Sequence, residues 1–103
     1  MPATSDLIDL MRARADALKE FGYKVRFDLT DSGEAILLDA TGGDLAVTEG
    51  EGEADAVLKL SSDTLDKLIT GKIGPLMAFS TGRLKVEGSQ GVALKLAGLL
   101  DGE

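Results

Sequence analysis

The chain has 103 residues, of which 44% are hydrophobic, and this length and composition fit one folded domain. Asp and Glu outnumber Lys and Arg by 18 to 11, so the net charge of −7 repels nucleic acid, and we expect no nucleic-acid partner. Histidine and cysteine are both absent, which excludes imidazole catalysis, thiolate chemistry, disulfides and the usual zinc ligands.

The beginning of the chain predicts an amphipathic helix. Apolar residues recur at helical spacing from Leu7 to Leu18, with charged residues largely between them. The side chains of residues 4–6 offer oxygens that cap a helix N-terminus, and Gly22 marks the end of the helix.

Four short strands with glycine-containing turns are predicted next. Alternation of apolar and polar residues predicts a first strand over residues 23–30 and a second over residues 34–40. Leu45 and Val47 mark a third strand, and residues 54–60 form a fourth. We expect these strands to form an antiparallel meander.

The remaining segments predict two short helices, a fifth strand and a last helix. In chain order they are a serine-capped helix ending at Gly71, a helix over residues 75–81, a strand over residues 83–87, and a helix from Ser89 to about Leu100. The order α-β-β-β-β-α-α-β-α describes an α+β domain. We expect residues 1–103 to form this single domain, with helices on one face of a five-stranded, mostly antiparallel sheet.

Several groups of polar residues resemble functional sites but lack the spacing or the partners that such sites require. The carboxylates of residues 49–55 match no calcium-loop spacing, so we interpret them as a solvated hairpin loop. Gly71 and Lys72 lack the other residues of a phosphate-binding loop. Asp63 and Asp66 fall on the solvent side of a helix. We therefore expect no catalytic residues, no metal and no cofactor, and a protein that is not an enzyme.

Neither end of the chain carries a recognised targeting signal. Residues 1–10 lack the basic region and long apolar core of a signal peptide, and the C-terminus lacks a peroxisomal Ser-Lys-Leu sequence. No window approaches the ~18 uninterrupted apolar residues of a membrane span. We expect a soluble, cytoplasmic protein without stable membrane insertion.

The last helix is apolar on two sides. One face, at ~100° per residue, collects the side chains of Val92, Ala93, Leu96, Leu99 and Leu100. Leu94 points nearly opposite, although a surface helix needs only one apolar stripe. Deep burial, a dimer contact and contact with an apolar ligand each explain this pattern.

Residues 54–100 follow a longer spaced pattern. It consists of a strand, a Ser-capped helix, Thr-Gly-Lys, Pro, Ala-Phe, Gly-x-Leu-x-Val-x-Gly and a leucine-rich helix. The positions that carry the pattern are Thr70, Gly71, Lys72, Pro75, Ala78, Phe79, Gly82, Leu84, Val86, Gly88 and Leu96. This pattern resembles that of the sterol carrier protein type 2 family, whose small lipid-binding domains also occur fused to peroxisomal enzymes.

The resemblance implies both a fold and a function. It implies helices on one face of a five-stranded sheet, enclosing an apolar tunnel for fatty acids, fatty acyl-CoA, sterols or phospholipids, and it implies no chemistry. Many family members known for membrane exchange are basic, whereas this chain has a net charge of −7. This difference argues against docking on anionic bilayers.

We therefore expect non-catalytic lipid binding, and intracellular lipid transfer, by a monomer or weak dimer. The residues expected to line the tunnel are apolar and belong to the later helices and the fifth strand: Leu65, Leu68, Ile69, Leu76, Met77, Phe79, Leu84, Val86, Val92, Leu96, Leu99 and Leu100. The alternative is a ligand-free interaction or dimerisation module that uses the apolar C-terminal helix.

Overall fold

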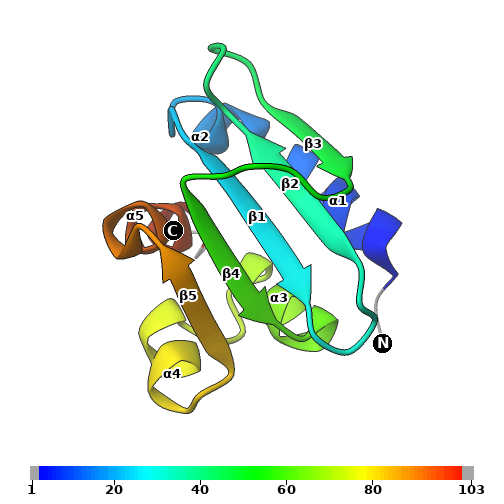
Figure 1. Ribbon diagram of the computed structural model, residues 1–103, viewed down its shortest axis with the longest axis vertical. Coiled ribbons are helices and arrows are strands. Elements are labelled where there is room, and N and C mark those ends of the chain that lie inside the picture. Colours follow the sequence, from blue (N-terminus) through cyan, green and yellow to red (C-terminus); the bar gives the residue numbers. More distant parts are fainter. Residues whose placement is uncertain (1–2, 101–103) are drawn as a thin grey trace.

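Five strands and five helices make up the part of the chain that the structure describes. The structure, a computed structural model, describes residues 3–100, except the side chains of residues 97 and 100. In chain order the elements are α1 (Thr4–Arg12), α2 (Ala15–Leu18), β1 (Lys24–Leu29), β2 (Ala35–Asp39), β3 (Ala46–Glu49), β4 (Ala56–Leu60), α3 (Ser62–Ile69), α4 (Pro75–Ser80), β5 (Leu84–Gly88) and α5 (Gln90–Leu100). The predicted α+β class with a five-stranded sheet is confirmed (Figure 1).

The sheet is mixed rather than wholly antiparallel. Its strand order is β3-β2-β1-β4-β5, and β4 lies parallel to β1 while the other neighbours are antiparallel. The predicted four-strand meander therefore extends over three strands, because the connection from β3 to β4 crosses over β2 and β1 (Figure 1). Alternation predicts which side chains a strand buries, but it leaves the neighbouring strand undetermined.

The predicted first helix is divided in two, and its predicted capping is wrong. Ala3 occupies the N-cap of α1 without a side-chain hydrogen bond, and Thr4 Oγ1 donates to Glu34 Oε1 at 2.6 Å instead. Between α1 and α2, Arg14 Nη2 donates to the carbonyl oxygen of Ile69 at 2.5 Å. This bond joins the break between the helices to the C-terminal end of α3, whose last carbonyls lack partners within the helix.

The two faces of the sheet differ in polarity. In β1 the side chains of Val25, Phe27 and Leu29 are buried, while the residues between them are half-buried. Helices α1, α2 and α3 lie behind the sheet in Figure 1 and cover this apolar face. Large buried side chains of the sheet and the helices therefore meet in a single core.

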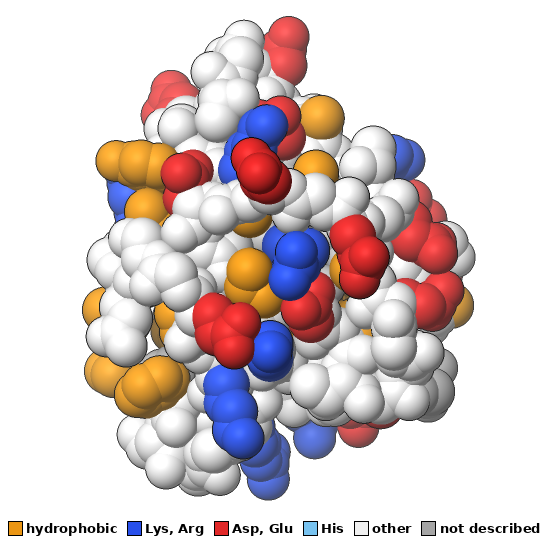
Figure 2. Space-filling model, in the orientation of Figure 1, with side chains coloured by type: hydrophobic (Ala, Val, Ile, Leu, Met, Phe, Trp, Pro, Cys, Tyr) orange, Lys and Arg blue, Asp and Glu red, His pale blue; other side chains and the backbone are white. Residues whose placement is uncertain are grey.

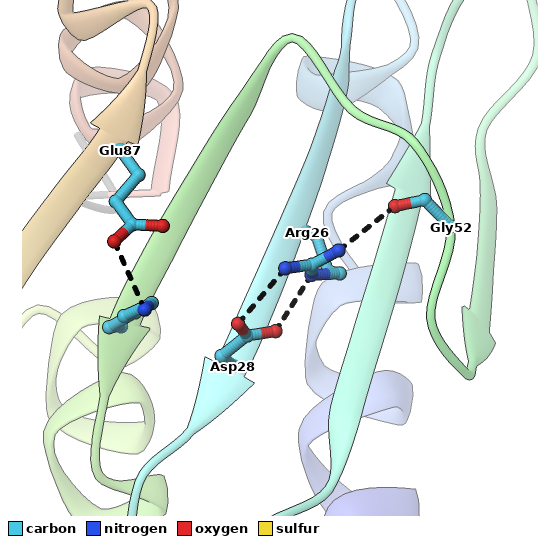
Figure 3. A network of polar contacts seen from close by, with 5 residues as sticks. Arg26, Asp28, Gly52 and Glu87 are labelled. Carbon is cyan, nitrogen blue, oxygen red and sulfur yellow. Dashed lines mark hydrogen bonds and ion pairs between the residues drawn. The ribbon is translucent and has the colours of Figure 1, made fainter.

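Charged side chains pair on the opposite face (Figure 3). Arg26 Nε donates to Asp28 Oδ1 at 2.8 Å, and Arg26 Nη1 donates to the carbonyl oxygen of Gly52 at 3.2 Å. The hydrogen bond to Asp28 raises the pKa of Arg26. Lys59 Nζ lies 3.1 Å from Glu87 Oε2 and so links β4 to β5. This face is polar, so any apolar site must lie on the helical side.

Asp31, in the turn between β1 and β2, holds the first turn of α3. Its Oδ1 accepts a hydrogen bond from Ser62 N at 3.0 Å, and its Oδ2 accepts one from Ser62 Oγ at 2.5 Å. Ser61 Oγ accepts from Thr64 N at 3.1 Å, as the sequence predicted for one of these serines. The hydrogen bonds from Ser62 lower the pKa of Asp31.

Because its folded-state pKa is lowered, Asp31 contributes stability that is present above its unfolded-state pKa of about 3.9 and is lost as the pH falls through the folded-state value. We expect Asp31→Asn to lower the free energy of unfolding by about 1 kcal/mol at pH 7, because an amide has one acceptor oxygen and loses a charge-assisted hydrogen bond from Ser62. This difference from wild type should vanish in acid. Urea denaturation at pH 7 and near pH 2 measures both values, with exposed Asp44→Asn as the control. A difference that persists unchanged in acid would contradict the assigned role.

Gly88 ends β5 where the backbone of the neighbouring strand comes close. Gly88 has φ +80°, and a Cβ atom there would lie 2.8 Å from the carbonyl oxygen of Asp55 and 3.3 Å from Ala56 Cα. Gly82 has a similar φ of +77°, but a Cβ atom there would meet nothing within 4 Å. Substitutions at the two glycines therefore distinguish the cost of a positive φ, which both share, from the cost of a steric clash, which arises only at Gly88.

We expect Gly82→Ala to cost about 1 kcal/mol of unfolding free energy, because an L-residue disfavours positive φ. Gly88→Ala should cost a further ~1–3 kcal/mol, because the added methyl group overpacks against backbone. Urea denaturation of both variants measures the difference. Equal losses would show that the close approach of β5 to β4 is not a constraint.

Candidate functional site

An apolar cavity of about 190 Å³ lies between the β4–β5 side of the sheet and helices α4 and α5. The residues that line it are Leu58, Pro75, Leu76, Phe79, Leu84, Val86, Gln90, Ala93 and Leu94. Leu58 and Leu84 are buried at its base, whereas Leu76, Phe79 and Leu94 are exposed and form its mouth. Gln90 is the single polar side chain among these lining residues.

The register of β5 supplies one wall of the cavity. Val86 pairs with Leu58, and Leu84 pairs with Leu60, in an antiparallel ladder. Leu84 and Val86 are two residues apart and therefore point to the same face of the sheet. This face is the one that the helices cover, so the edge of the sheet presents an apolar surface to α4 and α5.

Helix α4 forms a second wall although it is only six residues long. Gly74 is in an extended conformation, and Pro75 occupies the first helical position, where its missing N–H group costs no hydrogen bond. Ala78 is the one buried residue of α4, which leaves Leu76 and Phe79 at the cavity mouth. The chain then turns at Gly82 into β5.

Helix α5 provides the third wall of the cavity. Its place between the core and the cavity explains why this helix is apolar on two sides. Its first turn is held by Ser89, whose Oγ accepts from Val92 N at 3.3 Å. Leu96 is fully buried in the core, whereas Leu94 is 62% exposed and lines the cavity. The apolar side chains of α5 thus meet the core on one side and the cavity on the other.

The structure places the predicted tunnel residues in three settings. Leu76, Phe79, Leu84 and Val86 line the cavity. Leu65, Leu68, Ile69 and Leu96 are buried in the core, and Val92 and Leu99 are half-buried against it. Met77 is exposed next to Leu76 without lining the cavity, and the side chain of Leu100 lies outside the described residues. Contact with a ligand stays a prediction for all of them.

Five lining residues were not among those predicted: Leu58, Pro75, Gln90, Ala93 and Leu94. Leu94 carried a usable signal, because it is an apolar residue on the side of the helix away from the core. Leu58 carried none, since its place follows from the pairing of β4 with β5. Gln90 has no apolar character that would mark it.

The groups with shifted pKa values lie away from the cavity. Asp39 accepts hydrogen bonds from Thr41 Oγ1 at 2.6 Å and Thr41 N at 2.9 Å, and these lower its pKa. Neither Asp39 nor Asp31 lines the cavity. Within residues 3–100, no cluster of three or more Asp, Glu, His or Cys residues is arranged to hold a metal ion. The lining therefore offers apolar surface rather than acid–base groups.

A search of the described helices for one with the length and apolar character of a membrane span finds none.

The fold and the cavity define a class of small α+β domains in which a mixed sheet and its helices enclose an apolar cavity. The pattern of the SCP-2 sterol transfer family matches residues 5–101, and the chain belongs to this family. The resemblance inferred from residues 54–100 is thereby confirmed and extends over nearly the whole chain.

Solved structures agree with this assignment. The apo form of sterol carrier protein 2 from Yarrowia lipolytica is 31% identical, with a TM-score of 0.71, and the match covers 92% of this chain and 84% of that chain. The sterol carrier protein domain 2 of Helicoverpa armigera is 26% identical, with a TM-score of 0.72, and the match covers 96% and 85%.

Curated relatives include much longer proteins. Hydroxysteroid dehydrogenase-like protein 2 from Bos taurus is 35% identical over 89 residues, which are 84% of this chain but 21% of that protein. The chain thus spans about a fifth of the length of this relative.

Proposed function

We propose that this domain binds single lipid molecules in the cavity between β5, α4 and α5, and carries them between membranes or to an enzyme without altering them. The ligand classes are fatty acids, fatty acyl-CoA, sterols and phospholipids. The observation that carries the proposal is an apolar cavity with exposed leucine and phenylalanine side chains at its mouth, in a chain of the SCP-2 family.

The size of the cavity limits what it holds without rearrangement. An apolar cavity of roughly 150 Å³ is large enough for benzene, so 190 Å³ admits a ring or a segment of acyl chain. A long acyl chain offers on the order of 10 kcal/mol of gross stabilisation when fully buried, and micromolar affinity needs about 8 kcal/mol net. Most of a long chain must therefore leave water for tight binding.

We infer that α4 moves away from α5 to make this room. Helix α4 is short, and Ala78 is its one buried residue, so its displacement exposes little apolar surface. Leu76 and Phe79 are already at the mouth and would cover the part of the lipid's acyl chain that the present cavity does not hold. Loose selection among lipids follows, because apolar contacts are not directional.

Freshly purified protein should carry lipid. Native mass spectrometry is expected to show a population heavier than the bare chain by the mass of one lipid, and organic extraction should release that lipid for identification. A ligand-free dimer that also takes up no fluorescent fatty acid would contradict the proposal. That result would favour the alternative, an interaction module that uses α5.

Leu94 gives a direct test of the site, because it is exposed in the absence of ligand and its replacement leaves the core intact. We expect Leu94→Gln to weaken binding of a fluorescent fatty acid about tenfold, through lost apolar contact. Met77→Gln is the matched comparison, since Met77 is 59% exposed and does not line the cavity. It should weaken binding less. Titration of both variants measures this, and the reverse order would place the site elsewhere.

The name of the longer relatives raises the question of catalysis. Because the lining residues include no ionisable side chain, we propose that a domain of this kind supplies the binding function and that any catalysis in a longer protein belongs to its other parts. A monomer or weak dimer in the cytoplasm is part of the same proposal.

A further inference from the structure

Large apolar side chains are exposed together around the cavity mouth. Leu76 is 74% exposed, Met77 59%, Phe79 52% and Leu94 62%, and these residues belong to α4 and α5. Tyr23, the other large apolar residue exposed in the described chain, has the Lys95 ammonium 5.2 Å from its ring centroid. The exposed apolar surface is therefore concentrated at one place rather than scattered.

The segment that contributes three of these four exposed side chains is basic, although the chain is acidic. Residues 67–86 contain Lys67, Lys72, Arg83 and Lys85, and no Asp or Glu. All 18 acidic residues lie elsewhere in the chain. Although the chain has a net charge of −7, the segment that includes α4 and most of β5 is positively charged.

The basic and the apolar side chains adjoin in space. An open groove beside the cavity is lined by Lys59, Lys85 and Glu87 together with Phe79, Leu84 and Val86. Lys59 pairs with Glu87, but Arg83 and Lys85 take part in no ion pair among the described residues. Figure 2 shows Lys and Arg gathered over the lower part of this face, where α4 and β5 lie, with apolar side chains at lower left and most acidic side chains above and to the right.

Resting on the lipid-binding function proposed above, we propose that Leu76, Met77, Phe79 and Leu94, with Arg83 and Lys85, form a docking face for an anionic lipid bilayer. Apolar side chains of a peripheral protein enter the boundary between headgroups and acyl chains, while lysine and arginine attract anionic headgroups. The acidic remainder of the molecule is repelled by the same surface, so one orientation is favoured.

The position of the cavity favours a bilayer over an acidic protein as the partner. Leu76, Phe79 and Leu94 belong both to the docking face and to the cavity mouth. In the docked orientation the mouth opens onto the hydrocarbon boundary. A lipid then passes between bilayer and cavity without exposing its apolar part to water, whereas an acidic protein surface would cover the mouth.

Sedimentation with vesicles tests this orientation. The protein should bind phosphatidylcholine vesicles that contain phosphatidylglycerol, bind pure phosphatidylcholine vesicles more weakly, and lose the difference at high salt. Arg83→Glu should weaken binding to the anionic vesicles on the order of tenfold. Lys19→Glu is the matched control, since it makes the same change of charge at an exposed site after α2. It should have a much smaller effect.

Equal losses in the two variants would overturn the proposal, because net charge alone would then govern binding. A dimer that dissociates in Arg83→Glu, without vesicle binding by the wild type, would also overturn it and assign the face to a second, acidic copy of the chain. Uptake of a fluorescent fatty acid in the absence of vesicles reports on the proposed lipid-binding function by itself. Failure of docking is thereby distinguished from failure of lipid binding.

Discussion

The pairing of β5 with β4 is the constraint on which the site depends. The antiparallel register places Leu84 and Val86 on the helical side of the sheet, and the absence of a side chain at Gly88 lets the end of β5 lie against the backbone of Asp55 in that register. A slip of one residue would turn Lys85 and Glu87 inward. Because β5 is an edge strand, its apolar side is covered mainly by α4 and α5, which leave part of it open. The space that remains is the cavity.

The distribution of charge explains how an acidic chain can approach an anionic surface. Net charge governs long-range repulsion, but docking depends on the charges that face the partner. In this chain the acidic residues lie outside residues 67–86, where the exposed apolar side chains of α4 and the basic side chains beside them occur together. The argument against membrane docking, which rested on a net charge of −7, therefore applies to the molecule as a whole and not to the proposed docking face.

Most local features of the structure were predictable, apart from the cap and the break of the first helix, and long-range features were not. Alternation predicted β1 and β2, Pro75 and Gly82 bounded α4, and Ser61 capped α3 as expected, because these depend on neighbouring residues. The place of β4 beside β1 depends on a crossover, which leaves no local signal. Leu65, Leu68 and Ile69 satisfied the same apolar pattern as Leu76 and Phe79, and only tertiary packing separates core residues from cavity residues.

The charged side chains of β5 help to explain how such a domain avoids aggregation through its exposed strand edge. An edge strand presents unpaired backbone groups to other chains, and an adjacent apolar mouth adds to the tendency to self-associate. Lys85 and Glu87 are exposed on β5, and Glu87 is held by Lys59 on the outer face. Charged side chains on an edge strand disfavour the addition of a second strand, because the added strand would strip water from them. The open cavity and resistance to edge-to-edge aggregation are therefore compatible within one five-residue strand.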